Sequence, residues 1–153
     1  MLRIKESKTA DTRSCDYRTV DKATLLASSV QHIGDVRAAL EFFRRMLSAA
    51  AQKHDWDKLE GIDHFHSDFA TGFKETGWWD NHRKVNRHHL LQADGIPADV
   101  NLIDVLEFIA DCVMAGKARG GEMYALKVDP ELMMRAFTNT ADLLSGQIVV
   151  EKE

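Results

Sequence analysis

The sequence predicts an all-α protein, and two observations lead to this fold class. Apolar residues recur at spacings of three and four along most of the chain, which is the period of a helix with one buried face. The chain has 153 residues, of which 44% are hydrophobic and 29% are charged, as in an ordinary globular domain. We therefore expect one compact domain of about five to six helices over residues 19–146, followed by a C-terminal tail at 147–153.

An N-terminal arm and a long helix are predicted first. Residues 1–18 are polar and have no hydrophobic period, so we expect a flexible arm. Asp21 is a suitable N-cap, and the helical period continues from there to Lys53. The pattern is compatible with one long amphipathic helix or with two stacked helices. Its apolar positions are Leu25, Leu26, Val30, Ile33, Val36, Leu40, Phe43, Leu47 and Ala50.

Shorter helices are predicted in the middle of the chain. The segment Leu59–Trp79 mixes aromatic residues with glycines, which indicates one short helix bounded by turns. The segment Asp80–Leu91 is predicted to be a helix that ends before a turn containing glycine and proline. Asp99 or Asn101 can cap the next helix, which runs through Met114.

The last part of the chain is predicted to hold one more helix. A glycine-rich joint at residues 116–121 separates it from the helix before. Asp129-Pro130 opens this helix with proline at its first position, and the apolar pattern extends to about Leu144. The segment Ile148–Val150 has the composition of a short strand, but it is too short to decide.

The charge balance limits the partners to be expected. The formal net charge is −4, so the chain has no overall positive field to hold a polyanion. We therefore expect no nucleic-acid polymer as partner. A small anionic substrate is compatible with this charge, because a metal ion and a few local cations suffice to hold it. A homodimer is also compatible with the sequence.

The cellular compartment is predicted from cysteines and hydrophobic runs. Cys15 and Cys112 are too few for a disulfide framework, and one lies in a polar arm while the other lies in an apolar helix. No apolar run has the length of about 18 residues that a membrane span needs, and residues 1–18 have no apolar signal region. We expect a cytoplasmic protein with neither a secretion signal nor a membrane partner.

The residues that indicate chemistry are histidines and acids. The chain has seven histidines, and all except His32 lie between residues 54 and 89. His54 is followed directly by Asp55, so an imidazole nitrogen and a carboxylate oxygen are offered to one point in space. This pair suits a divalent cation of intermediate hardness. Further ligands are available in the segment His82–His89.

These motifs resemble a known superfamily. The stretch from Thr24 to Leu144 is similar to an uncharacterised family of small phage and bacterial HD-like proteins, within the HD superfamily of metal-dependent phosphohydrolases. The matching segments are Gln31-His32-Ile33 with Val36, His54-Asp55-Trp56-Asp57-Lys58-Leu59, Trp79-Asp80-Asn81-His82, Asn86-Arg87-His88-His89 and Glu107-Phe108-Ile109-Ala110-Asp111. The resemblance implies a helical HD-like fold and a location in the cytoplasm of a bacterium or a phage-infected host.

The resemblance also implies a metal centre. One or two divalent ions per chain are expected, and Mn, Fe, Co, Ni, Zn and Mg are not distinguished by the sequence. The first ion would be bound by four residues, and three histidines would be available for a second. These residues are His32, His54, Asp55 and Asp111 for the first, and His82, His88 and His89 for the second.

Two related families mark the limits of the resemblance. The chain is similar to the HD-GYP cyclic-dinucleotide phosphodiesterases in joining His-Asp-x-x-Lys to a later His-His pair. Their tyrosine-proline element is absent, so their substrate is not carried over. Many single-metal HD nucleotidases have Glu at the position of Lys58, so this chain offers a cation in place of a general acid.

The spacing on helices tests some of these ligands. Glu107 and Asp111 are four residues apart and share a helix face. Together with Asp104 they could form a solvated acidic stripe, but apolar residues surround so much of this helix that a buried carboxylate with a cationic partner is favoured. We therefore favour Asp111 as a ligand by roughly two to one.

His32 is harder to place in the same site. One straight helix from Asp21 to Lys53 would separate His32 from His54 by about 33 Å. Either the helix breaks near Gly34 or Ser48, or His32 serves a neighbouring subunit, or it is a structural histidine. The resemblance favours a break.

The later histidines are predicted to divide between two directions. If Asp80–Leu91 is helical, His82 and His89 lie on one face, and His88 points about 100° away. His88 and His89 are then not expected to bind the same ion. His64 and His66 lie near a predicted turn without a pattern partner, so we expect them on the surface.

The predicted activity is hydrolysis of a small phosphate ester, with a nucleotide as the expected substrate class. A metal-activated water would be the nucleophile. The residues expected to be catalytic are Lys58, Glu107, Arg83 and Arg87, and the cations among them would neutralise developing charge. An exposed basic helix face is the alternative role of Arg83 and Arg87.

Two other functions are compatible with the sequence. Myo-inositol oxygenase and its relatives, which hold two irons, resemble this chain in Lys58 and in the surplus of histidines. They are much longer, and a His-His pair is atypical of them. The second alternative is a non-catalytic nucleotide-binding or interaction protein of phage type.

Overall fold

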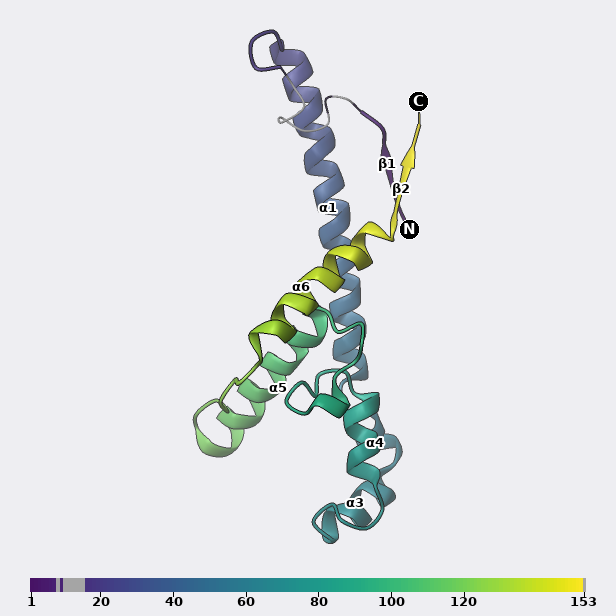
Figure 1. The fold of residues 1–153 in the computed structure, drawn as a ribbon, viewed down its shortest axis with the longest axis vertical. Helices are drawn as coiled ribbons and strands as arrows, with labels where there is room; N and C mark the ends of the chain where they lie inside the picture. Colours follow the sequence, from purple (N-terminus) through teal and green to yellow (C-terminus); the bar gives the residue numbers. More distant parts are fainter. Residues whose placement is uncertain (8, 10–15, 153) are drawn as a thin grey trace. The chain divides into compact units, whose positions relative to one another are not determined.

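The computed structural model of the chain describes residues 1–7, 9 and 16–152, and Cys15 lies outside this part. The fold is mostly helical, which confirms the all-α class (Figure 1). The elements are β1 (Leu2–Lys5), α1 (Lys22–Lys53), α2 (Trp56–Glu60), α3 (Ile62–Ala70), α4 (Trp78–Val85), the 3-10 turn η1 (Ala93–Gly95), α5 (Leu102–Gly120), α6 (Pro130–Ser145) and β2 (Ile148–Glu151).

The chain forms two compact units, which share α1 and α6. The first consists of residues 1–45 and 142–153, and the second consists of residues 46–141. Every candidate site residue except His32 belongs to the second unit. In the described part of the chain, none of the helices combines the length and the apolar character required to cross a bilayer.

The first unit contains a parallel strand pair and most of α1. Leu2 to Lys5 of β1 pair in register with Ile148 to Glu151 of β2. The strand at Ile148–Glu151 settles a point that the sequence left undecided. The prediction of an N-terminal arm without regular structure is corrected, because Leu2 and Ile4 are half-buried and alternate with exposed residues. The alternation extends over too few residues to be read as a strand from the sequence.

Helix α1 is one continuous helix of 32 residues, which settles the choice between one helix and two. Its start agrees with the predicted cap, because the backbone N–H of Thr24 donates a hydrogen bond to the Asp21 carboxylate at 2.7 Å.

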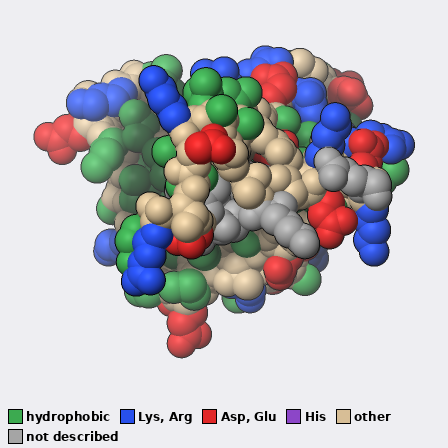
Figure 2. All heavy atoms as spheres, turned by 90° about the horizontal axis from the view of Figure 1, so that it is seen from above, with side chains coloured by type: hydrophobic (Ala, Val, Ile, Leu, Met, Phe, Trp, Pro, Cys, Tyr) green, Lys and Arg blue, Asp and Glu red, His purple; other side chains and the backbone are tan. Residues whose placement is uncertain are grey.

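Charges of both signs are interspersed with hydrophobic side chains on the face drawn in Figure 2, in keeping with the small net charge.

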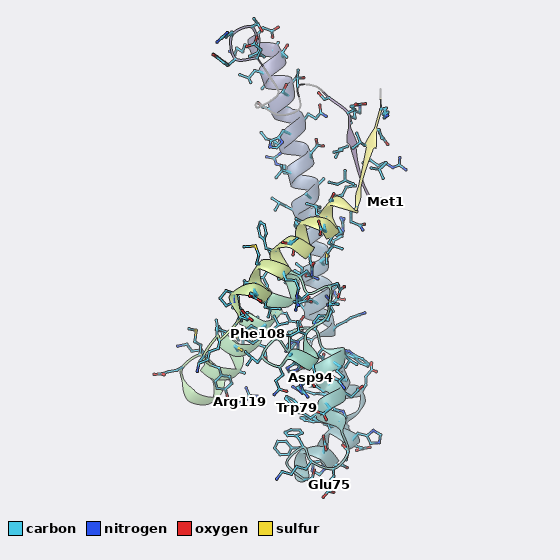
Figure 3. All side chains as sticks on the ribbon, in the orientation of Figure 1. Met1, Glu75, Trp79, Asp94, Phe108 and Arg119 are labelled. Atoms are coloured by element: carbon cyan, nitrogen blue, oxygen red, sulfur yellow. The ribbon has the colours of Figure 1, made fainter. Side chains whose placement is uncertain are left out.

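The core of the second unit lies around α5 and α6. Phe108 and Cys112 of α5 pack with Leu132 and Ala136 of α6, and Leu90 and Val100 add to the same cluster (Figure 3). The start of α5 is fixed by a capping box. The Asn101 side chain accepts a hydrogen bond from a backbone N–H of the first turn, and the Asp104 side chain accepts one from the backbone N–H of Asn101.

Helix α5 extends through the predicted glycine joint to Gly120, so the break expected at residue 116 is absent. A Cβ atom at Gly116 would lie 2.5 Å from the backbone oxygen of Glu122 and 2.6 Å from the backbone nitrogen of Tyr124. Glycine at this position therefore allows the returning chain to approach the helix closely.

The histidine-bearing segment differs from its prediction. Two helices, α2 and α3, precede α4, and α4 ends at Val85 although a helix to Leu91 is predicted. The buried Asp68 carboxylate fixes the start of α4 by accepting hydrogen bonds from the backbone N–H groups of Thr76 and Trp79, both at 3.0 Å. His88 and His89 therefore lie on irregular backbone after the helix.

Candidate metal centre

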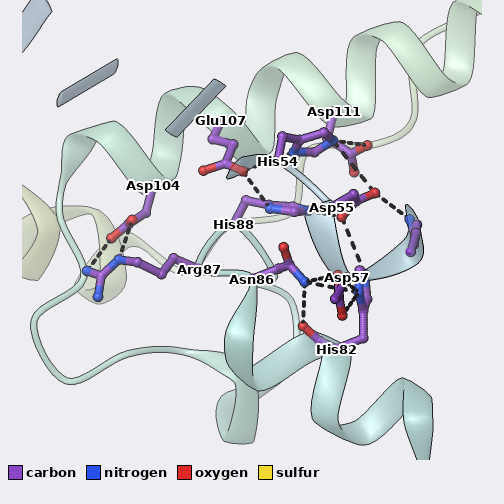
Figure 4. A network of polar contacts seen from close by, with 11 residues as sticks. His54, Asp55, Asp57, His82, Asn86, Arg87, His88, Asp104, Glu107 and Asp111 are labelled. Carbon is purple, nitrogen blue, oxygen red and sulfur yellow. Dashed lines mark hydrogen bonds and ion pairs between the residues drawn. The ribbon is translucent and has the colours of Figure 1, made fainter. Parts of the chain in front are cut away.

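The chain turns sharply at Asp55, between the end of α1 and the start of α2. The backbone of Asp55 has φ 52° and ψ 26°, which is the left-handed conformation. Aspartate tolerates this conformation better than most residues, because its short polar side chain can form local hydrogen bonds. The turn ends the path of α1 and places the Asp55 carboxylate beside His82 and His88 (Figure 4).

Nitrogen atoms from three parts of the chain surround this carboxylate. Nε2 of His82 lies 3.4 Å and Nε2 of His88 lies 3.5 Å from Oδ1 of Asp55. Nε2 of His54 lies 3.7 Å from Oδ2 of Asp55. Two donors that are each about 2.1 Å from one tetrahedral ion are about 3.4 Å apart, so these distances have the size that a shared ion requires.

The donors form two groups that share Asp55. His54, Asp55 and His88 make one group, and Asp55, His82 and His89 make the other. Within each group, one donor atom per residue lies within 4.8 Å of the others. The geometry therefore offers positions for one or two ions, and it assigns His88 and His89 to different groups, as the sequence predicts.

Several of these inward atoms have no partner within the protein. Oδ1 of Asp55 and the Nε2 atoms of His82, His88 and His89 are buried and make no hydrogen bond. A buried polar atom without a partner costs free energy, so such a concentration calls for a further group. A donor set of imidazole nitrogen and carboxylate oxygen fits a divalent transition metal such as zinc, iron or manganese.

Glu107 of α5 holds two of the imidazoles. Its Oε1 atom lies 2.9 Å from Nδ1 of His54 and 2.9 Å from Nδ1 of His88. A carboxylate at Nδ1 favours the tautomer that leaves Nε2 free to bind a metal. Burial raises the pKa of the Glu107 carboxyl, but His88 and His54 lower that pKa by more, so Glu107 is charged. The predicted catalytic residue therefore contacts the ligands as a positioning group.

Asp57 and Asn86 orient His82 in the same way. The Asp57 carboxylate lies 2.9 Å from Nδ1 of His82, and the Asn86 amide donates a hydrogen bond to Asp57 at 2.8 Å. Asn86 also donates to the backbone oxygen of His82 at 3.0 Å. The His82 ring stacks on Trp78 and Trp79, with ring centroids 4.7 Å and 5.2 Å away. The side chain of His82 is thus fixed on all sides except the one that faces Asp55.

Sequence reasoning did not identify Asp57 or Asn86 as functional residues. Both are contained in the matching motifs, and both are buried. The available signal is the spacing His-Asp-x-Asp, which places a second carboxylate two residues after Asp55. That spacing is informative only once the left-handed turn at Asp55 is known.

Burial favours the neutral form of His82 and His89. Burial lowers the pKa of His82 and outweighs the opposite effect of Asp57. Burial, together with the nearby His88 and His82, lowers the pKa of His89 to about 3. Because histidine binds a metal only in its neutral form, this environment favours metal binding over a wider pH range than free histidine would allow.

Asp111 and Lys58 complete the centre. Oδ1 of Asp111 lies 3.8 Å from Nε2 of His54, one helical turn beyond Glu107 as the spacing predicts. Nζ of Lys58 forms an ion pair with Oδ2 of Asp55. Burial raises the pKa of the Asp55 carboxyl, but Lys58, His54 and His82 together lower that pKa by more, which favours the ionised carboxylate.

Arg83 is not placed as the prediction of a substrate-binding cation requires. Its guanidinium donates hydrogen bonds to Asp94 at 2.6 Å and 3.1 Å and to Asp80 at 2.7 Å. These two carboxylates raise the pKa of Arg83 above its ordinary value. With two carboxylates already bound to it, Arg83 links α4 to η1 and has a structural role.

Arg87 is also paired with carboxylates. It donates to Asp104 at 2.8 Å and 2.9 Å and to Asp99 at 3.0 Å. These contacts connect the segment after α4 to the capped start of α5. That Arg87 neutralises substrate charge stays a prediction, and in this structure its guanidinium is paired with Asp104 and Asp99.

The remaining histidines lie outside the cluster. His64 and His66 are exposed on α3, as predicted. His32 is absent from the groups of possible ligands among the described residues, and the predicted break in its helix does not occur. The prediction of His32 as a ligand is therefore corrected: α1 contains no turn that would return it to His54.

A scan of protein families, a search of curated proteins and a search of solved structures each found no match to this chain. Function is therefore inferred from the site itself.

Proposed function

We propose that this protein is a metal-dependent phosphohydrolase of HD type that acts on a small phosphate ester, with a nucleotide as one substrate class. The observation that supports this proposal is the ring of buried donor atoms around Asp55, in which Oδ1 of Asp55 and Nε2 of three histidines have no partner. Such a set is suited to one or two divalent ions, with His54, Asp55 and His88 as ligands in one group, Asp55, His82 and His89 as ligands in the other, and Asp111 beside His54.

The protein's own residues would contribute in three ways. His54, Asp55 and the later histidines bind and fix the ion, and Glu107 and Asp57 hold those histidines in the required tautomer. When bound, a divalent ion supplies a water of lowered pKa as nucleophile and stabilises charge on the phosphoryl group. Lys58 lies beside Asp55 and would provide a positive charge for the oxygen atoms of the phosphoryl group.

A second candidate is an oxygenase that holds two irons, and one observation favours it. Arg83 and Arg87 are both neutralised by carboxylates, so a phosphate would find few free cations near the centre. A site that activates dioxygen does not need such cations. Iron in the purified protein, a near-ultraviolet iron absorption band and oxygen uptake with a substrate would support this second candidate.

Metal analysis followed by phosphate release tests the first proposal. The purified protein is analysed for metal, then stripped and reloaded with Mn²⁺, Co²⁺, Ni²⁺ or Fe²⁺. Release of phosphate from nucleotides and from simple phosphate esters is measured for each form. Metal-dependent release that is lost on removing the metal supports the proposal. Tight nucleotide binding without release in every metal form would contradict it and favour the non-catalytic alternative.

A further inference from the structure

The ligands of the centre differ in their access to solvent. The side chains of His82 and His88 are 0% and 1% exposed, whereas those of His54 and Asp111 are 34% and 36% exposed. His54 and Asp111 lie together on one side of the cluster, between α5 and the end of α1 (Figure 4). Among the candidate ligands, these two residues therefore offer a side of the cluster that is open to solvent.

A cavity of about 310 Å³ adjoins the centre on this side, and its walls are apolar. His54, Glu107 and Asp111 form its polar end. The other lining residues come from α1 and α5 and are Leu47, Ala50, Ala51, Leu106, Ala110 and Met114. No lysine or arginine is among the lining residues, so the cavity cannot neutralise an anion away from the metal.

The available charge limits the anionic part of a substrate to one compact group. All three cations predicted to bind substrate pair with carboxylates, and Lys58 is the one whose partner, Asp55, belongs to the donor cluster. An anionic group can thus be held at the metal and at Lys58, and the adjoining part of the molecule meets an apolar wall. An enclosed apolar cavity of about 150 Å³ is large enough to hold benzene, so this larger pocket, which is open to solvent at Leu106 and Met114, has room for a ring.

We propose that the cavity beside His54 and Asp111 binds an apolar, ring-sized group of the substrate. Among small phosphate esters the preferred substrates are then aryl or alkyl phosphate monoesters, and nucleotides, which carry their phosphate on a sugar, are not preferred. This inference rests on the proposed function and specifies its substrate class. A group in this cavity is held by removal of apolar surface from water, without hydrogen bonds beyond those at the polar end.

The test compares two stable phosphonates that carry the same anionic head. Binding of phenylphosphonate and methylphosphonate to the Mn²⁺-loaded protein is measured by calorimetry. We expect phenylphosphonate to bind at least about tenfold more tightly, because only its ring reaches the apolar walls. Equal affinities would overturn the inference.

Variants that fill the cavity make the comparison specific. Ala110→Phe on α5 and Ala51→Phe on α1 both change exposed positions of the lining, so the core is left intact. Each is expected to remove the preference for the phenyl group without changing metal content or methylphosphonate affinity. Ala118→Phe, an exposed position on α5 outside the lining, is the matched control and should behave as the unchanged protein. A phenyl preference that survives both filled variants would also overturn the inference.

A second pair of probes separates this inference from the phosphohydrolase proposal. Benzohydroxamate and acetohydroxamate bind metals without a phosphate, and they differ by the same apolar ring. If neither phosphonate binds but benzohydroxamate is preferred over acetohydroxamate, the phosphohydrolase proposal fails and the cavity assignment stands. If neither pair shows a preference for the ring, the cavity assignment fails whatever the activity of the protein.

Discussion

Nδ1 of the buried His88 lies 2.9 Å from Oε1 of Glu107, and the same oxygen lies 2.9 Å from Nδ1 of His54. One carboxylate thereby contacts two imidazoles that come from segments far apart in the sequence, with a hydrogen bond to His54 and a close contact without hydrogen-bond geometry to His88. The Nε2 atoms of both rings are directed toward Asp55 as a result.

Replacing Glu107 with Gln should weaken metal binding while preserving the fold. The amide has no negative charge beside the two Nδ1 atoms, so it favours the tautomer and orientation that binding requires less strongly than the carboxylate does. Partners of this kind are commonly worth about 10–100-fold in metal affinity. A competition titration with a chelator measures the change. Glu107→Asp keeps the charge on a shorter stem and should recover part of the affinity, and unchanged affinity in Glu107→Gln would refute the positioning role.

His54 and Asp55 are expected to be metal ligands. The double variant His54→Ala, Asp55→Ala should lose bound metal and keep its helical circular dichroism, because the pair lies in a turn outside the hydrophobic core. Asp63→Ala, His64→Ala is the matched control, because it removes an adjacent acid and histidine that are exposed on α3. Full metal content in the first double variant would rule out this centre.

Lys58 and Arg83 should respond differently to replacement with Met. Lys58→Met removes a cation beside Asp55, so turnover should fall by about 10²–10³-fold while metal content stays near that of the unchanged protein. Arg83→Met removes the partner of Asp80 and Asp94, so it should lower the thermal unfolding temperature and leave turnover of the folded protein unchanged. Turnover and metal stoichiometry are measured on the same preparations. Equal turnover in Lys58→Met and in the unchanged protein would show that the charge of Lys58 has no part in catalysis.

The stability of the metal-free protein should fall as the pH is lowered from about 6.5. The pKa of His89 is about 3 in the folded chain, and an unfolded histidine has its ordinary pKa of about 6.5. Between these values the unfolded chain binds a proton that the folded chain does not, so acid favours unfolding by up to about 1.4 kcal/mol per pH unit for this group. The lowered pKa of His82 acts in the same direction.

Urea unfolding of the metal-free protein at pH 7.5 and pH 5.5 measures this effect. His89→Asn removes the titrating group and should reduce the loss of unfolding free energy over that interval. Carboxylates with ordinary pKa values titrate mainly at lower pH, so they do not produce the same change. Identical pH dependence in the variant and the unchanged protein would contradict the prediction.

The helices with a long apolar period could be predicted from the sequence. The bounds of α1 and α6 agree with prediction because local spacing and capping residues determine them. The end of α4 could not be predicted, because Asn86 leaves the helix to bond Asp57, which lies 29 residues earlier in the chain. The sequence contains both residues but not their contact.

The candidate site was predictable in its ligand types and not in its geometry. His54, Asp55 and Asp111 could be selected because adjacent residues or a spacing of four fix their proximity. Arg83 pairs with Asp94 of η1, and Arg87 pairs with Asp99 and with Asp104 of α5, so these contacts join separate elements and could not be read from local patterns. The resemblance predicts His32 as a ligand, whereas the spacing along one straight helix separates His32 from His54. The uninterrupted helix α1 agrees with the spacing.

The left-handed backbone at Asp55 restricts what evolution or design can place at this position. Longer and β-branched side chains are disfavoured at φ 52°, while aspartate, asparagine and glycine are tolerated. Of these three, only aspartate carries a charge. Folding and ion binding therefore select the same amino acid, and a protein that gave up the ion would be free to drift to asparagine or glycine without disturbing the turn.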